Sequence, residues 1–157
     1  MRISRLIEEG TQELRNHYIE TARLDCDLLL AGILGKSREW LYANSEAMVK
    51  ESDGCSFYKL INRRAFGEPI AYIQGFKHFY HNDFLVTPAV LVPRPETELL
   101  VEEALRWIKD SSKKPFSSAI SIADLGTGSG CIGLTLVKEV ECASLVAVDI
   151  SAEALAV

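Results

Sequence analysis

The spacing of apolar residues predicts that residues 1–66 are helical throughout. One helical face of the first stretch is formed by Ile3, Leu6, Ile7, Gly10 and Leu14. A second stripe is formed by Leu24, Leu28 and Ala31. Gly35 follows this stripe and is a suitable C-terminal cap, because glycine readily adopts the left-handed conformation that ends many helices.

Two more helices are expected before residue 68. Ser37 suits the N-cap of a short helix that holds Trp40 and Leu41. A longer helix is expected from about Asp53 to Gly67. One side of this helix is formed by Phe57, Leu60, Ile61 and Arg64. Because short helices with short connections form small bundles, residues 1–68 are predicted to be a helical domain.

The pattern changes at Pro69, and residues 69–92 are expected to form a β-hairpin that links two domains. The apolar positions of its two predicted strands are Phe76, Phe79 and Tyr80, then Phe84, Leu85 and Val86. The polar residues 81–83 lie between these runs and are the predicted turn.

Residues 93–157 are predicted to begin an α/β domain. The segment around its start is kept out of a central strand by Pro88, Pro93 and Pro95. Glu96 and Glu98 are expected in the first turn of a helix, where the helix dipole favours acidic residues. This helix is expected to reach Ile108, and residues 111–118 form a polar connection to the next element.

A strand, a turn, a helix and a second strand are predicted next. The first apolar run is formed by Ala119, Ile120, Ile122 and Ala123. It leads through Asp124 into the glycine turn 126–130, and a helical pattern follows. A second apolar run, 145–148, ends at Asp149. This order is typical of the first half of a nucleotide-binding α/β fold.

The glycine turn and Asp149 have the chemistry of a ligand site. Glycines allow a sharp turn and a close approach of the ligand to the backbone. The helix after the turn offers free amides and the positive end of its dipole. A carboxylate after the second strand can accept hydrogen bonds from a ribose diol. Asp149 lies 149 − 130 = 19 residues beyond Gly130, close to the spacing of about 20 that this role requires.

Two glycine registers point to different cofactors. Gly128, Gly130 and Gly133 satisfy the dinucleotide pattern G-x-G-x-x-G. Gly126, Gly128 and Gly130 instead follow Asp124 in the pattern D-x-G-x-G-x-G. A carboxylate suits the sulfonium and ammonium of S-adenosylmethionine and would repel a pyrophosphate, so the second register is preferred. NAD binding and a purely structural turn remain as alternatives.

Composition excludes several functional classes. The 157 residues are 48% hydrophobic and 25% charged, as in an ordinary globular protein. No apolar run approaches the roughly 20 residues of a membrane helix, and the N-terminus lacks a signal sequence, so a cytoplasmic protein is expected. A net charge of −5 argues against direct nucleic-acid binding. The four cysteines lack a metal-binding spacing and are expected to be buried free thiols, and no metal site is expected at His78 and His81.

Four motifs carry a family resemblance. They are RLDCDLLLAGILGKSREWLYA, GEPIAYIQGFKHFY, VLVPRPETELLVEEAL and IADLGTGSGCIGLTL. From about residue 20 onwards, the chain resembles the release factor glutamine methyltransferases, the HemK/PrmC family. The combination of PRPETE with DLGTGSG is the specific part, since DLGTGSG alone occurs in many methyltransferases.

The resemblance implies a fold, a reaction and a cofactor site. The fold is a helical substrate-recognition domain, a hairpin linker and a Rossmann-type methyltransferase domain. The reaction is transfer of a methyl group from S-adenosylmethionine to the glutamine of the Gly-Gly-Gln motif in peptide chain release factors. In that site Gly126, Thr127, Gly128, Ser129 and Gly130 would hold the methionine part. Asp149 would bind the ribose, and Leu91, Arg94 and Thr97 would line the opposite side.

The sequence departs from the family in one respect. The catalytic Asn-Pro-Pro-Tyr motif of the family is absent, and no Asn-Pro dipeptide occurs. No catalytic residue is therefore assigned, and the chain is expected to be an inactive, truncated N-terminal portion of such an enzyme. The alternatives are a non-catalytic module that binds release factors, and a methyltransferase with another protein or nucleic-acid substrate.

Overall fold

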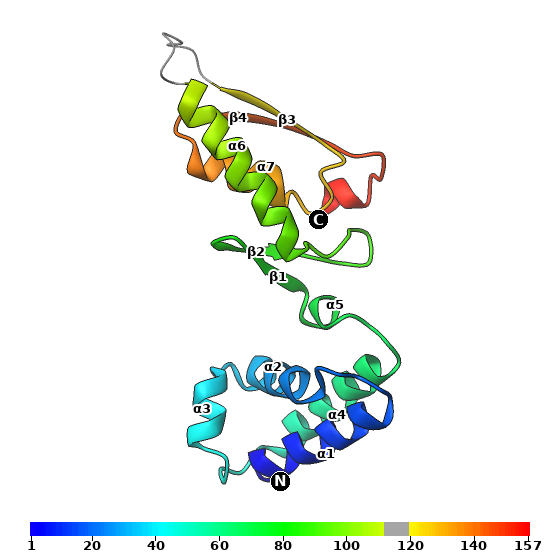
Figure 1. Ribbon diagram of the computed structural model, residues 1–157. Coiled ribbons are helices and arrows are strands. Elements are labelled where there is room, and N and C mark those ends of the chain that lie inside the picture. The colour runs from blue at the N-terminus through cyan, green and yellow to red at the C-terminus, as the bar shows by residue number, and fades with distance from the viewer. Residues whose placement is uncertain (112–119) are drawn as a thin grey trace. The chain divides into compact units, whose positions relative to one another are not determined.

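The computed structural model describes residues 1–111 and 120–157 (Figure 1). The chain divides into two compact units, Met1–Gln74 and Gly75–Val157. The first unit contains only helices in its named elements, whereas the second combines helices with strands.

The helical unit contains five helices. They are α1 (Ile3–Asn16), α2 (Ala22–Leu34), α3 (Arg38–Ala43), α4 (Glu51–Ala65) and α5 (Ile70–Gln74). The first four confirm the helical prediction for residues 1–66, but α5 was not predicted. Pro69 does not end the helical pattern, because proline is tolerated at the start of a helix and its carbonyl accepts the amides of Tyr72 and Ile73.

The core of this unit confirms one predicted stripe and corrects another. All five residues of the α1 stripe are buried, and they pack with Phe57 and Ile61 of α4. In α2 the buried face includes Cys26, Leu29 and Leu30, whereas Leu24 is 40% exposed. The α2 stripe was wrong at Leu24 because α2 contacts α1, α3, α4 and α5, so its buried face is set by those neighbours and not by one narrow seam.

Two local caps mark helix ends in this unit, and a buried ion pair joins two of its helices. Gly35 ends α2 with a φ of 60°, and the Ser37 side chain accepts the amide of Trp40 at 3.2 Å, as predicted. Asp25 of α2 is buried and accepts a hydrogen bond at 2.7 Å from Nε of Arg64 in α4. Since a buried carboxylate is costly without a partner, this pair fixes α4 against α2.

The hairpin consists of β1 (Phe76–Phe79) and β2 (Asn82–Leu85), which pair antiparallel. The predicted turn was too long and misplaced. Phe79 pairs with Asn82, so only Tyr80 and His81 form the turn, and residues 82 and 83 belong to β2. Tyr80 has a φ of 57°, which is the backbone conformation that lets two residues close a hairpin.

The rest of the second unit is a βαβ arrangement preceded by a helix. Its elements are the 3₁₀ turn η1 (Pro95–Thr97), α6 (Glu98–Ser111), β3 (Ser121–Leu125), α7 (Cys131–Glu139), β4 (Ser144–Val148) and the 3₁₀ turn η2 (Ala154–Ala156). β3 and β4 pair in parallel, which confirms both predicted strands. Ala119 of the first predicted strand and residues 112–118 of the polar connection lie outside the described residues.

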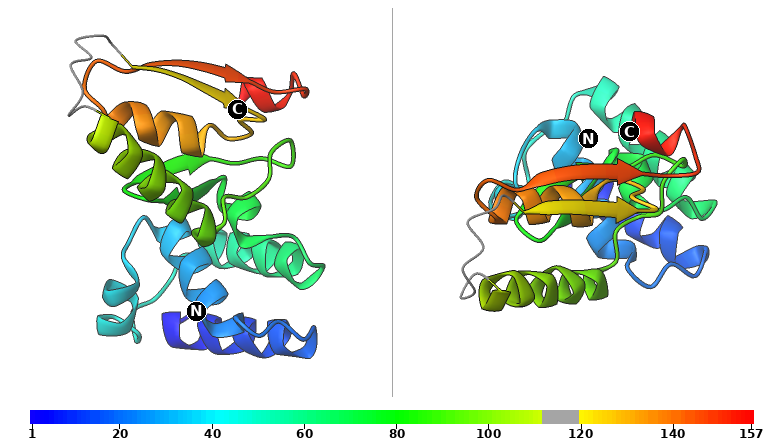
Figure 2. Two further views of the ribbon diagram at one scale, coloured as in Figure 1. Left: turned by 45° about the horizontal axis from the view of Figure 1, so that its top comes forward. Right: turned by 90° about the horizontal axis from the view of Figure 1, so that it is seen from above.

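Among the described residues, helices cover only one face of the β3–β4 pair. Figure 2 shows α7 along one side of the two strands, with α6 beside it. Ile122 packs with the cluster that contains Phe79, Phe84 and Val101. On the other face Leu125 is 77% and Val146 63% exposed. Strands that are apolar on both faces are normally buried on both, so this sheet presents an open apolar face.

The cysteine prediction was half correct. All four cysteines are free, and Cys26 and Cys131 are buried, but Cys55 and Cys142 are exposed. Burial raises the pKa of Cys26 to about 11. This thiol therefore stays protonated and acts as a small apolar core residue.

Two helical glycines provide a matched test of core packing. A Cβ at Gly10 would lie 2.9 Å from the Phe57 ring and 3.1 Å from Sγ of Cys26, whereas one at Gly32 would meet nothing within 4 Å. We expect Gly10→Ala to lower the free energy of unfolding by about 1–3 kcal/mol through overpacking. Gly32→Ala should raise it by about 0.5–1 kcal/mol because alanine is the better helix former. Urea unfolding followed by circular dichroism measures both, and an unchanged or increased stability of Gly10→Ala would contradict the packing argument.

Candidate functional site

The glycine turn between β3 and α7 has an unusual backbone. Gly126, Gly128 and Gly130 have φ values of 76°, 54° and 73°. Other residues rarely adopt this left-handed region, so the alternating glycines are needed for the turn itself. Gly130 is also the N-cap of α7, which directs the amino end of that helix towards the turn.

The carboxyl end of β4 holds this turn from the side. The carbonyl of Val148 accepts the amides of Gly126 at 2.7 Å and Thr127 at 3.0 Å. The Asp149 carboxylate accepts the amide of Gly128 at 2.9 Å through Oδ2 and that of Ser151 at 3.0 Å through Oδ1. Hydrogen bonds from the amides of Ser151 and Gly128 lower the pKa of Asp149, so its charge is stabilised next to the turn.

Asp124 holds the turn from within. Its Oδ2 atom accepts a hydrogen bond from the Thr127 hydroxyl at 2.9 Å and another from the Gly133 amide at 3.0 Å. A Cβ at Gly133 would lie 2.8 Å from both this oxygen and Cδ1 of Leu145. Gly133 is therefore needed for close packing of α7 on the strands, and this role does not depend on which cofactor register applies.

The structure places the remaining predicted residues in the same compact unit. Ser129 is half-buried within the turn. Leu91 is 75% exposed, Arg94 is exposed, and Thr97 donates its amide to the carbonyl of Arg94 at 3.0 Å. Figures 1 and 2 show the segment before α6 on the same side of the unit as the carboxyl ends of β3 and β4. Among the described residues, no hydrogen bond or ion pair joins these three residues to the turn or to Asp149.

A hollow of about 390 Å³ lies between β2 and α7. From the glycine turn only Ser129 lines it, and Asp149 is not among its lining residues. The hollow is therefore distinct from the place where Asp149 meets Gly128.

One contact near the site was not anticipated. Glu98, at the start of α6, accepts the amide of Tyr80 at 2.8 Å and so fixes the hairpin turn to that helix. The sequence signal was an acid in the first turn of a helix, which was attributed only to the helix dipole.

In the part of the chain that is described, no group of three or more His, Cys, Asp or Glu could hold a metal ion. No described helix is long and apolar enough to cross a membrane.

Comparison with known proteins gives a consistent result. Residues 5–75 match the family model of the PrmC N-terminal domain. A release factor glutamine methyltransferase of Nitratidesulfovibrio vulgaris is 40% identical over 151 residues, which cover 96% of this chain and 49% of that protein. One of Koribacter versatilis is 39% identical over 155 residues, which cover 99% of this chain and 53% of that protein. A bifunctional methyltransferase of Rickettsia bellii is 33% identical over an alignment of 175 positions, which covers 99% of this chain and 32% of that protein.

The alignments cover a much larger share of this chain than of its relatives. Nearly all of this chain aligns with the first two relatives, but it spans only about half of their length.

The hydrogen bonds to Asp149 predict a pH dependence of the turn. The folded-state pKa lies below the ordinary aspartate value of about 3.9, so the stabilising contribution of this carboxylate is present above that pH. It is lost as the pH falls through the lowered pKa. We expect the Gly128 amide signal in NMR spectra to titrate with a midpoint below 3.9 and to lose this step in Asp149→Asn. A midpoint at or above 3.9 would contradict the contact.

Proposed function

We propose that this chain, which belongs to the release factor glutamine methyltransferase family and corresponds to the N-terminal half of its relatives, binds S-adenosylmethionine at the glycine turn and Asp149. The complete enzyme would use this cofactor to methylate N5 of the glutamine in the Gly-Gly-Gln motif of peptide chain release factors. Since release factors act in translation, the cytoplasm is the proposed location.

The observation that carries this proposal is the anchored carboxylate of Asp149. Two backbone amides orient it and favour its ionised form. A carboxylate has about four acceptor positions, so each oxygen can accept a further hydrogen bond from a ribose hydroxyl. In this assignment residues 126–130 hold the methionine part of the cofactor, and the opposite side is formed by Leu91, Arg94 and Thr97.

The charge of the turn favours a cationic ligand. Residues 124–133 contain Asp124 but no lysine or arginine, and Asp149 adds a second carboxylate. S-adenosylmethionine brings a sulfonium and an ammonium to such a site, whereas NAD brings two phosphates. Electrostatic attraction therefore supports the methyl donor over the dinucleotide.

The reaction needs groups that this chain does not supply. An amide nitrogen is a weak nucleophile, so its orientation and desolvation must contribute much of the rate. The sequence contains no Asn-Pro dipeptide. We assign the amide-holding Asn-Pro-Pro-Tyr motif to the other half of the relatives' length, whose strands and helices would cover the open face of β3 and β4.

Calorimetry with the 157-residue chain tests the cofactor. We expect S-adenosylmethionine to bind and NAD not to bind. Asp149→Asn should weaken S-adenosylmethionine about 10–100-fold, because a hydrogen bond to a charged group contributes about 1.5–3 kcal/mol. Glu141→Gln is the control, since it removes an exposed carboxylate of the same unit. Preference for NAD, or equal affinity of Asp149→Asn, would refute the assignment.

A methyl-transfer assay tests whether the catalytic groups lie in the half of the relatives' length that this chain does not span. With radiolabelled S-adenosylmethionine and a purified release factor, the chain alone should transfer no methyl group above the background without enzyme. A fusion of the chain to the C-terminal half of a relative should restore transfer to the glutamine. Full activity of the chain alone would show that the Asn-Pro-Pro-Tyr motif is not required.

A further inference from the structure

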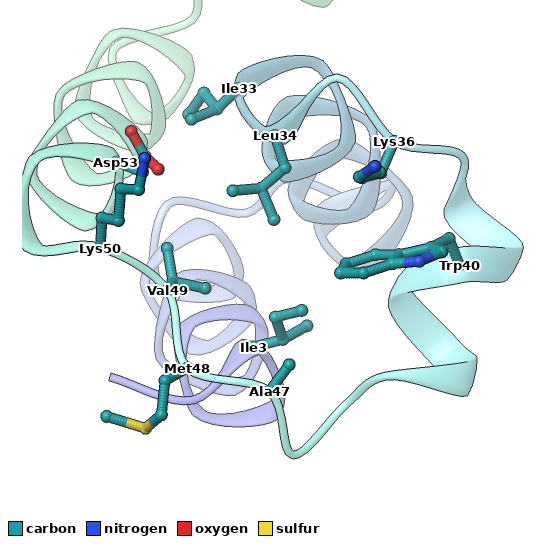
Figure 3. Close-up of a pocket in the computed structure, with 10 residues that line it drawn as sticks. All are labelled: Ile3, Ile33, Leu34, Lys36, Trp40, Ala47, Met48, Val49, Lys50 and Asp53. Carbon is teal, nitrogen blue, oxygen red and sulfur yellow. The ribbon is translucent and has the colours of Figure 1, made fainter.

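The helical unit contains a hollow of about 450 Å³ that the cofactor site does not use. Figure 3 shows it between the start of α1, the end of α2, α3 and the segment 47–50, here called the strap. Ile3, Leu34 and Val49 provide its apolar lining, and the Trp40 ring extends into it from α3. It is therefore a groove with an apolar floor and an aromatic wall.

The strap is held rigidly by backbone hydrogen bonds. The carbonyl of Ala47 accepts the amide of Ile3 at 3.1 Å, and that of Met1 accepts the amide of Val49 at 2.8 Å. Arg2 and Met48 form an isolated β-bridge. The strap thereby satisfies an amide at the start of α1 that has no partner within the helix. Because the groove is already formed, a ligand would not have to order it on binding.

Large apolar side chains at the groove are left in contact with solvent. Met48 is 74% and Trp40 36% exposed, although both lie beside the apolar lining. Tryptophan and methionine are enriched at protein interfaces, where tryptophan in a pocket is a frequent source of binding energy. A side chain that fills the groove would cover the Trp40 face, whereas the Met48 side chain points away from the hollow and adds apolar surface beside it (Figure 3).

The mouth of the groove carries positive charge. Nζ of Lys36 lies 5.4 Å from the centroid of the Trp40 ring, and Lys50 stands on the strap. Neither lysine takes part in an ion pair among the described residues, whereas six arginines of this unit do: Arg2, Arg5, Arg23, Arg38, Arg63 and Arg64. Asp53 is the one carboxylate that lines the groove within the described part of the chain. In a chain of net charge −5, this excess of cations favours an acidic partner.

We propose that this groove docks an acidic segment of the release factor, with one large apolar side chain between Trp40 and Val49 and flanking carboxylates near Lys36 and Lys50. The proposal rests on the proposed function and adds the surface by which the substrate is held. A glutamine side chain offers little contact area, whereas stable protein complexes bury about 1,200–2,000 Å². Contacts remote from the reacting amide can supply the missing binding energy.

Binding of the full chain to the release factors of its source organism tests the groove. With Trp107→Phe as background, Trp40 is the remaining tryptophan and its fluorescence reports on the groove. We expect the double variant Lys36→Glu and Lys50→Glu to weaken binding at least tenfold and to reduce its salt dependence. Trp40→Ala leaves no tryptophan in this background, so its binding is measured by calorimetry, and it should be weakened at least tenfold as well. The control is Lys59→Glu, an exposed lysine on α4 outside the groove, which should bind normally.

The outcomes separate this proposal from the cofactor assignment. Both lysines are exposed, so their reversal should leave the circular dichroism spectrum and S-adenosylmethionine affinity unchanged. If the charge-reversed variant binds release factor as tightly as the parent chain, the groove proposal is wrong and the proposed function stands. If no release factor binds the chain while S-adenosylmethionine does, the groove proposal is also overturned and only the substrate half of the proposed function is in question. If the chain without substitutions does not bind S-adenosylmethionine, the proposed cofactor site is contradicted instead.

Discussion

The glycine turn depends on the carboxyl end of β4, which accepts three of its backbone amides. The Val148 carbonyl takes two of them and the Asp149 carboxylate takes the third. A backbone with three positive φ values has no regular hydrogen-bonding pattern of its own, so these acceptors replace the missing partners. The parallel pairing of β3 and β4 brings them to the turn, because strands that run in the same direction end at the same edge.

The two carboxylates at the turn, Asp124 and Asp149, have different structural roles. Asp124 is directed inwards and is engaged by the Thr127 hydroxyl and the Gly133 amide, so it acts as part of the turn. Asp149 lies at the end of the neighbouring strand and keeps acceptor capacity on both oxygens. The proposed ribose contact therefore falls to Asp149, while Asp124 maintains the shape that the ligand would meet.

The two compact units differ in how completely they bury their apolar residues. In the helical unit, α1, α2 and α4 enclose a core with fully buried Leu6, Leu30 and Phe57. In the second unit, Leu125 and Val146 remain exposed on the uncovered face of the sheet. The relatives' additional length agrees with the proposal that further strands and helices cover this face.

The sequence alone determined the local features, because they depend on residues close together in the chain. The α1 stripe, the caps at Gly35 and Ser37, and the strands on either side of the glycine turn were all predicted correctly. Features that depend on distant residues required the tertiary structure. Leu24 is exposed because four helices define the buried face of α2, and the partners of Asp124 and Gly128 become visible only when β3, β4 and α7 are assembled. The groove at Trp40 likewise exists only because the strap pairs with the start of α1, a contact between residues more than 40 positions apart.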